Sequence, residues 1–341
     1  MIEPLNIVLI TSGLRRIAHF FPELSGKPVG IINWSDSPST HANRFVQNEW
    51  TRRLYAKLQR RQFANLPHLC ARHNLRYANL YKKDGDALKR TLQDWECNLV
   101  ITSNCSFVPT DALAHLSHGA INMHPSRLPD YRGAEPLLWQ LAAAEPTLAT
   151  TIHRLADQFD CGDIVAQASI ARPPGANRDT LADLTETRLG KPLLNKAIDL
   201  LAADPAYKGK VQPEKSATPY AYRKSSDEFG NQFSLTQFTS NTVWDLIQYF
   251  GQCPSPWLDN SILQKKLVWV PTQLQDVSKA SIVDQHPISA ANAQRNVWQI
   301  YRHGFTTRLI YNNSTQIILK PRWRSFVGLS GLLRSNPPMG K

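Results

Sequence analysis

Long hydrophobic runs are missing from this 341-residue chain. No stretch approaches the ~20 consecutive apolar residues that a membrane-spanning helix requires, so we expect no transmembrane segment. The first residues, MIEPLNIVLITSG, include Glu3 and no basic region, and Ser12 and Gly13 end the apolar run early. We interpret them as a first β-strand rather than a signal peptide.

Cysteine is also scarce. The chain has five cysteines, and no two of them form a CxxC pair. An odd number without that spacing argues against a disulfide framework or a structural zinc site and favours a reducing cytoplasm. The histidines at 41, 68 and 73 lack metal-ligand spacing, so we expect no metal.

Acidic residues are few relative to basic ones: 27 Asp and Glu stand against 39 Lys and Arg, which gives a net charge of +12. This excess favours an anionic partner such as nucleic acid, a nucleotide, a polyglutamylated cofactor or a phospholipid surface, although a solubilising surface would have the same composition. In residues 44–61, Trp50, Leu54 and Leu58 recur at helical spacing among six basic residues. We expect a helix there whose basic face is either solvated or in contact with phosphates.

Short β-rich runs alternate with helical stretches through the first 170 residues. The strand candidates are residues 6–11, 28–33, 97–104, 120–124, 149–155 and 164–170. Near-continuous apolar strands separated by helices predict an α/β fold, a Rossmann-like, doubly wound and mostly parallel sheet covered on both faces.

The later part of the chain has a different pattern of helix and strand candidates. A helical stretch at 178–202 contains Gly190 and Pro192, which predict a kink or break. We therefore expect a catalytic domain over 1–202, a proline-containing linker over 203–224, and a smaller C-terminal domain over 225–325. Its helix candidate at 241–251 and its short strand candidates suit a β-barrel-like, OB-like domain. Residues 326–341 are expected to form a basic tail.

Two polar side chains stand at the end of one predicted strand. In INMHPSRLPDYRG (121–133), Asn122 and His124 are two residues apart, so they project from the same face of the strand. Open parallel sheets place their binding crevice at this end of the strands. An amide can stabilise an oxyanion and an imidazole can move a proton. A carboxylate to orient the imidazole could come from Asp157, Asp160 or Asp163, and spacing alone does not choose among them.

The segments NMHPSRLPDYRGAEP (122–136) and TTIHRLADQFDCGDIVAQ (150–167) together resemble the core of the folate-dependent formyltransferases. The family pattern consists of Asn-x-His, a Leu-Pro-x-Tyr/Trp-Arg-Gly loop, and an Asp-x-Gly turn after a strand. The resemblance selects Asp160 as the carboxylate. It also suggests that SNCSFVP (103–109) is the loop that contributes backbone groups to the pterin pocket.

This resemblance implies an enzyme that uses 10-formyltetrahydrofolate as its donor. Asn122 and protonated His124 would stabilise the oxyanion, and Asp160 would stabilise the imidazolium. The implied donor-binding residues are Ser103, Asn104, Cys105, Ser106, Phe107, Val108, Gln158 and Phe159. The implied acceptor-binding residues are Ser126, Arg127, Tyr131, Arg132 and Gly133. We expect His153 to be structural or pocket-lining rather than catalytic.

The sequence leaves two candidates for the amine that accepts the formyl group. The first 95 residues contain no Gly/Arg-rich loop of the kind that enters a tRNA acceptor stem, which favours a nucleotide-linked amino sugar or another small amine. Residues 211–229 and 243–259 resemble the start of the C-terminal domain of methionyl-tRNA formyltransferase, and the positive charge suits tRNA. Initiator methionyl-tRNA is therefore the alternative acceptor. A catalytically silent relative that binds RNA or folate is a third possibility.

Overall fold

The computed structural model describes residues 5–35, 66–258, 267–276, 289–292, 297–303, 306–311 and 315–323. Within them the chain divides into two compact units: unit 1 comprises residues 1–140, 146–172 and 181–222, and unit 2 comprises residues 141–145, 173–180 and 223–341. The predicted basic helix at 44–61 and the predicted tail at 326–341 lie outside the described residues. No helix in the described ranges has the length and apolar character needed to cross a membrane.

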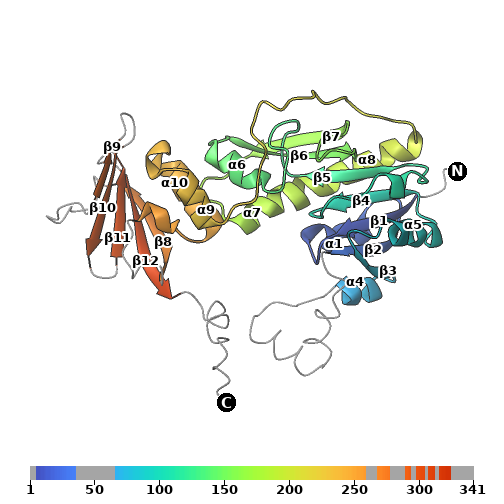
Figure 1. Cartoon of the computed structure of the whole chain (residues 1–341), viewed down its shortest axis with the longest axis horizontal. Helices are drawn as coiled ribbons and strands as arrows, with labels where there is room; N and C mark the ends of the chain where they lie inside the picture. The colour runs from blue at the N-terminus through green and yellow to red at the C-terminus, as the bar shows by residue number, and fades with distance from the viewer. Residues whose placement is uncertain are drawn as a thin grey trace, which may run out of the picture. The chain divides into compact units, whose positions relative to one another are not determined.

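Unit 1 is built on a seven-stranded sheet with the strand order β3-β2-β1-β4-β5-β6-β7 (Figure 1). The strands β1 to β5 pair in parallel, whereas β6 and β7 are antiparallel. The strand bounds are β1 Asn6–Thr11, β2 Lys27–Ser35, β3 Arg76–Tyr81, β4 Leu99–Ser103, β5 Ala120–His124, β6 Thr147–Arg154 and β7 Ile164–Ala171. The predicted mostly parallel α/β sheet is confirmed. The half-exposed edge strand β3 was not recognised in the sequence.

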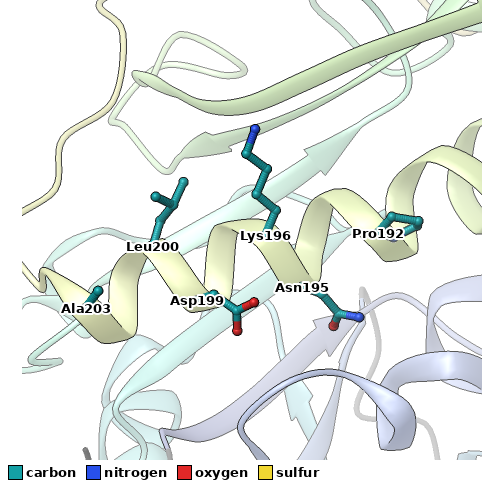
Figure 2. A pocket seen from close by; sticks show the side chains of 6 residues that line it. All are labelled: Pro192, Asn195, Lys196, Asp199, Leu200 and Ala203. Carbon is teal, nitrogen blue, oxygen red and sulfur yellow. The ribbon is translucent and has the colours of Figure 1, made fainter.

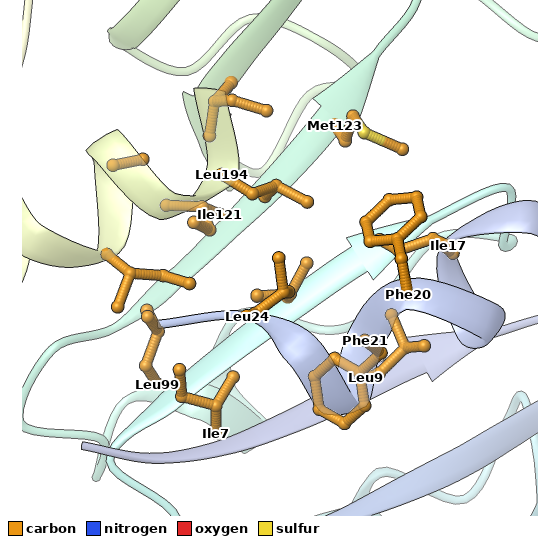
Figure 3. Packing of buried hydrophobic residues seen from close by; sticks show 14 of the residues in the cluster. Ile7, Leu9, Ile17, Phe20, Phe21, Leu24, Leu99, Ile121, Met123 and Leu194 are labelled. Atoms are coloured by element: carbon orange, nitrogen blue, oxygen red, sulfur yellow. The ribbon is translucent and has the colours of Figure 1, made fainter. Parts of the chain in front are cut away.

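Helices cover both faces of this sheet. On one face, α1 (Arg16–Phe20), α4 (Leu66–Arg72) and α8 (Lys191–Ala203) bury apolar side chains against β1, β4 and β5. Figure 3 shows Leu194 of α8 among Ile121, Met123 and Leu24 in this layer. On the other face lie α5 (Gly85–Asp94) and the 3-10 turn η2 (Asp111–Leu113), packed on Val8, Ile10 and Val100. This is the doubly wound arrangement that the sequence pattern indicates.

The predicted helix at 178–202 is interrupted. It consists of α7 (Arg178–Ala182), a π-helical segment η3 (Asp183–Gly190) and α8. The change from π- to α-helix falls beside Gly190, where a side chain would meet the Met123 sulfur at 2.4 Å. The Thr150 hydroxyl donates to the Thr185 carbonyl at 2.7 Å and so fastens η3 to β6.

Another short helix, α6 (Pro136–Ala142), follows the loop after β5. Its Leu138 and Leu141 are buried, and the Gln140 amide donates to the Pro125 carbonyl at 2.9 Å. The helix thus holds the start of the loop that follows the strand.

Unit 2 combines short helices with a five-stranded antiparallel sheet of order β8-β12-β11-β10-β9. Helix α9 (Ser226–Gln232) begins with a Ser225–Glu228 capping box, and α10 (Ser240–Phe250) ends at Gly251 in the left-handed conformation. The strands are β8 Leu267–Asp276, β9 Ser289–Asn292, β10 Val297–His303, β11 Thr306–Tyr311 and β12 Thr315–Trp323. The predicted helix and β-rich character are present, and closure into a barrel stays a prediction.

Most of the predicted linker, residues 203–224, lies within unit 1. Its contacts use backbone and polar groups: the Ala221 amide donates to the Arg132 carbonyl at 2.7 Å, and Thr218 accepts from the Tyr131 amide at 2.6 Å. The segment has few apolar side chains, so its sequence resembles that of a linker. Hydrogen bonds made by the backbone cannot be recognised from amino-acid composition.

The packing of α8 on the sheet predicts a large effect of truncation at its centre. Leu194 is completely buried, so Leu194→Ala should lower the free energy of unfolding of unit 1 by about 2–5 kcal/mol. Urea unfolding followed by circular dichroism measures this. Val211→Ala, at a side chain that is 73% exposed, is the control and should change stability by less than about 0.5 kcal/mol. Equal effects of the two variants would contradict the packing described.

Candidate active site

Strand β5 presents its polar side chains at the carboxyl end of the parallel sheet. Ile121 and Met123 point into the core with α8, so Asn122 and His124 point to the opposite face. Because β6 runs antiparallel to β5, His153 lies directly across from Asn122 in the register. Cross-strand partners share a face, and the Asn122 Nδ2 and His153 Nε2 atoms are 3.0 Å apart.

The loop after β5 folds back over the His124 ring. Its Leu128 amide donates to the Thr151 hydroxyl at 3.2 Å, and that hydroxyl donates to the Ser126 carbonyl at 2.6 Å. Tyr131, at φ +59°, places its carbonyl oxygen 3.0 Å from His124 Nε2. Since a carbonyl only accepts, this nitrogen carries a proton.

Asp160 reaches the same place from the turn between β6 and β7. It has φ +57°, and the Gln212 amide donates to its carbonyl at 3.0 Å and to that of Gly162 at 2.5 Å. A side chain at position 162 would lie 1.9 Å from the Arg154 carbonyl, so the turn requires glycine there. Asp157, the first alternative, instead accepts a hydrogen bond from Thr110.

The Asp160 carboxylate is the point where these elements converge. Its Oδ2 accepts from the Gly133 amide at 2.9 Å. Its Oδ1 lies 3.5 Å from His124 Nδ1, 3.6 Å from His153 Nε2 and 3.5 Å from Asn122 Nδ2. The three residues predicted to be catalytic therefore lie together, with His153 as a fourth member. We call Asn122, His124, His153 and Asp160 the polar cluster.

Comparison with known proteins points to the same part of the chain. Residues 51–195 match the formyl transferase family. This part of the chain is a formyl transferase domain. The match includes every member of the polar cluster and both loops predicted to bind the donor.

Individual relatives agree with the family match. The chain is 30% identical over 145 residues to methionyl-tRNA formyltransferase from Lactobacillus acidophilus, which covers 42% of this chain and 46% of that protein. It is 36% identical over 123 residues to the enzyme of the same name from Syntrophus aciditrophicus, covering 36% of this chain and 38% of that protein. The chain thus spans less than half the length of these curated relatives.

Among solved structures, glycinamide ribonucleotide transformylase 1 from Symbiobacterium toebii is similar at 19% identity and a TM-score of 0.47, covering 61% of this chain and 93% of that one.

Charge in the polar cluster of the formyl transferase domain is set by burial and by its neighbours. Burial raises the pKa of Asp160, but the histidines and the Gly133 amide outweigh it and hold the pKa at about 2. Burial lowers the pKa of His124 below its ordinary value of 6.5, while the Asp160 carboxylate and the Tyr131 carbonyl oppose this effect. The resting cluster therefore pairs an ionised Asp160 with a largely neutral His124 at neutral pH.

A narrow cavity adjoins the polar cluster on the side of the predicted donor loop. About 70 Å³ in volume, it is lined by Asn122, His153 and Asp160, by Cys105, Ser106, Phe107, Val108, Gln158 and Phe159, and by Thr102, Leu155 and Ala156. Six of the eight predicted donor-binding residues thus line it. Ser103 is buried at the end of β4, and the Asn104 amide contacts Glu186 at 3.4 Å.

The residues that line the cavity suit a folate ring, but the volume of the cavity is smaller than such a ring needs. Its lining mixes apolar side chains with polar ones, which suits a flat heteroaromatic ring that carries hydrogen-bonding edges. Its volume is below the roughly 300–1,000 Å³ typical of ligand pockets, and the half-exposed Phe107 and Phe159 side chains form part of its lining.

The predicted acceptor-binding residues divide into two groups. Tyr131 and Gly133 contact the polar cluster directly. Arg132 is buried and donates to the Gln212 side chain and to the carbonyls of Pro213 and Glu214. Ser126 is fully buried, and Arg127 donates to Ser169, so both lie outside the lining of the cavity.

The expectation that His153 is structural or pocket-lining agrees with its place in the lining of the narrow cavity. Side chains alternate along a strand, so His153 shares a face with Thr151. The antiparallel pairing of β5 with β6 is what brings His153 opposite Asn122. Its Nδ1 lies 2.8 Å from the Arg154 carbonyl, so Nδ1 carries the proton and Nε2 accepts from the Asn122 amide.

A second hollow, of about 580 Å³, follows helix α8 (Figure 2). Its lining residues, Pro192, Asn195, Lys196, Asp199, Leu200 and Ala203, all belong to that helix. None of the predicted site residues lies there, so the candidate active site is the cavity beside the polar cluster.

The electrostatics of His124 can be tested by its titration. Proton NMR of the imidazole, assigned by its loss in His124→Ala, should show a midpoint below 6.5 because burial disfavours the charged ring. In Asp160→Asn the midpoint should fall further, since the carboxylate raises the His124 pKa. A midpoint above 6.5, or an upward shift in Asp160→Asn, would contradict this description.

Proposed function

We propose that the formyl transferase domain transfers a formyl group from 10-formyltetrahydrofolate to a primary amine. The observation that supports this function is the convergence of three side chains on one ionised carboxylate: nitrogen atoms of Asn122, His124 and His153 each lie within 3.6 Å of Asp160 Oδ1. The donor supplies an activated formyl carbon whose oxygen gains negative charge when an amine attacks. The residues of the chain must stabilise that charge and move one proton.

Asn122 is oriented to donate. Its Oδ1 accepts from the Thr102 hydroxyl at 2.9 Å, which directs the NH₂ group toward His153 and the cavity. One N–H is satisfied by His153 Nε2 at 3.0 Å. The other makes a long hydrogen bond of 3.5 Å to Asp160 Oδ1 at rest and would exchange it for the developing oxyanion, where such a donor is worth about 3–4 kcal/mol of transition-state stabilisation.

His124 moves the proton in this proposal. Burial keeps it largely neutral at rest, so it can accept a proton as the attacking amine loses one. It then returns that proton to the folate nitrogen as the bond between this nitrogen and the formyl carbon breaks, which releases tetrahydrofolate and the formylated amine. The imidazolium that forms is already flanked by the Tyr131 carbonyl at 3.0 Å and by Asp160 Oδ1 at 3.5 Å. Asp160 stays ionised, because its pKa is about 2, and stabilises the charged ring. His153 positions Asn122.

The acceptor is proposed from charge and from the relatives. The net charge of +12 suits a polyanionic acceptor, and the curated relatives are methionyl-tRNA formyltransferases. We therefore place an aminoacylated tRNA first and retain a nucleotide-linked amino sugar as the second acceptor to test. Both candidates present a primary amine attached to a nucleotide.

Removal of the oxyanion donor should affect turnover far more than folding. With a fixed amine acceptor, Asn122→Ala should lower kcat by about 10²–10³, and His124→Ala should reduce transfer at least as much. The measurement is release of tetrahydrofolate from 10-formyltetrahydrofolate. His115→Ala, at an exposed histidine, is the matched control and should retain full turnover. If His124→Ala retained normal turnover, the proposed proton transfer would be wrong.

The acceptor can be identified by its salt dependence as well as by the product. Each candidate should be tested with the donor: methionyl initiator tRNA and a panel of amino-sugar nucleotides. Binding of tRNA should weaken steeply as salt rises, because counterions are released from its phosphates, whereas a sugar nucleotide has too few phosphates for a steep slope. We expect formylated methionyl-tRNA with a steep slope. Formylation of an amino-sugar nucleotide alone would reverse the order of the two acceptors.

A further inference from the structure

The exposed aromatic side chains of unit 1 gather in one place. Among the described residues, the large hydrophobic side chains with the highest exposure are Phe107 (38%), Phe159 (49%), Tyr220 (37%), Tyr222 (61%) and Val211 (73%). The four aromatic residues all line one cavity of about 650 Å³, a volume usual for a ligand pocket. Exposed apolar groups concentrated at one site indicate a binding surface. We call this cavity the aromatic cleft.

The aromatic cleft adjoins the proposed reaction site. Phe107, Gln158 and Phe159 line both the cleft and the narrow cavity beside the polar cluster. The Phe107 and Phe159 rings meet edge to face with centroids 5.5 Å apart, and the Tyr220 and Tyr222 rings lie 4.7 Å apart. A ligand in the cleft would therefore reach the reacting groups past the Phe107–Phe159 pair.

One wall of the cleft comes from outside the matched domain. Residues 216–222 follow the family match, which ends at residue 195, yet they are fixed to the loop over His124. The Tyr131 amide donates to Thr218, the Ala221 amide donates to the Arg132 carbonyl, and the Glu135 amide donates to the Ala221 carbonyl at 2.9 Å. The matched domain already contains the donor loop and the polar cluster, so this added wall is suited to recognise the acceptor.

The charges in the cleft favour a neutral ring. Arg132 is the one cation among its lining residues, and its two terminal nitrogens donate to Gln212, Pro213 and Glu214. Its Nε is shielded from solvent. Asp157 adds a negative charge, and the Ser216 and Thr218 hydroxyls add polar edges. A carboxylated folate tail finds no available cation here, whereas a neutral heteroaromatic ring finds aromatic faces and hydrogen-bonding groups.

We propose that the aromatic cleft binds the nucleobase of the acceptor, with Tyr222 and its neighbouring rings as the stacking surface. This inference rests on the proposed formyl transfer for the identity of the reaction, but binding of the base does not require turnover. Both acceptors under test contain a nucleoside: the terminal adenosine of an aminoacyl-tRNA or the pyrimidine nucleoside of a sugar nucleotide. Stacking on an aromatic side chain changes affinity roughly 5- to 150-fold per base.

The test is isothermal titration of the full-length protein with AMP, UMP, dTMP, ribose 5-phosphate and 5-formyltetrahydrofolate, a stable analogue of the donor. The variants are Tyr222→Ala, which removes the ring, and Tyr222→Phe, which retains it. Val211→Ala is the matched control because Val211 is exposed outside the cleft. Circular dichroism of each variant verifies folding.

We expect at least one of the three nucleotides to bind more tightly than ribose 5-phosphate and to lose about tenfold in affinity in Tyr222→Ala. Tyr222→Phe and Val211→Ala should bind it within twofold of the unmodified protein, and folate affinity should be the same in all four proteins. A preference for AMP assigns the base to a tRNA end, and a preference for UMP or dTMP assigns it to a sugar nucleotide.

The proposal is overturned if no nucleotide binds better than ribose 5-phosphate, or if Tyr222→Ala leaves nucleotide affinity unchanged. Weaker folate binding in Tyr222→Ala also overturns it and assigns the cleft to the donor. Failure of the proposed reaction looks different: no acceptor is formylated, although nucleotide affinity still depends on Tyr222.

Discussion

A single buried carboxylate, that of Asp160, determines how the candidate active site is organised. It accepts a hydrogen bond from the Gly133 amide and faces Asn122, His124 and His153 at 3.5 to 3.6 Å. Burying a charge is costly unless it is paired and hydrogen-bonded. The Gly133 and Asn122 amides donate to Asp160, and His124 pairs with it whenever the ring is protonated. The left-handed conformation of Asp160 and the absence of a side chain at Gly162 are backbone requirements of the same arrangement.

The fold supplies these neighbours from separate parts of the sequence. Strand β5 ends at the carboxyl edge of the parallel strands, β6 returns beside it in the opposite direction, and the turn before β7 delivers Asp160. Helix α8 packs through Leu194 on the face of the sheet that carries Ile121 and Met123. The other face of β5 is left to the polar side chains of Asn122 and His124. The segment 203–222 then fixes the turn that carries Asp160 through a hydrogen bond from Gln212, and it fixes the loop over His124 through the hydrogen bond from the Tyr131 amide to Thr218. The geometry of the polar cluster therefore depends on residues well outside the strand that holds Asn122 and His124.

The sequence predicted those elements of the fold that leave a pattern of residue spacing or a helix-breaking residue. Strand β5 was predicted at its observed bounds because apolar residues alternate with Asn122 and His124, and the break near Gly190 followed from backbone chemistry. The resemblance to a known family selected Asp160 from three aspartates. Pairing direction was not predictable, since an isolated strand does not show whether its neighbour runs parallel or antiparallel, and the position of His153 depends on that direction. The role of residues 203–224 was also hidden, because its contacts are made by backbone groups that composition does not reveal.

The central claim is that Asp160 stays ionised in the folded protein because its neighbours outweigh the effect of burial. Carbon-13 NMR of the aspartate side-chain carboxyl groups, with Asp160 assigned by its loss in Asp160→Asn, measures this directly. The account predicts a carboxylate signal that does not titrate between about pH 8 and about pH 4.5, below which ordinary aspartates begin to protonate, since the pKa of Asp160 is about 2. Protonation of Asp160 within that pH range would contradict it.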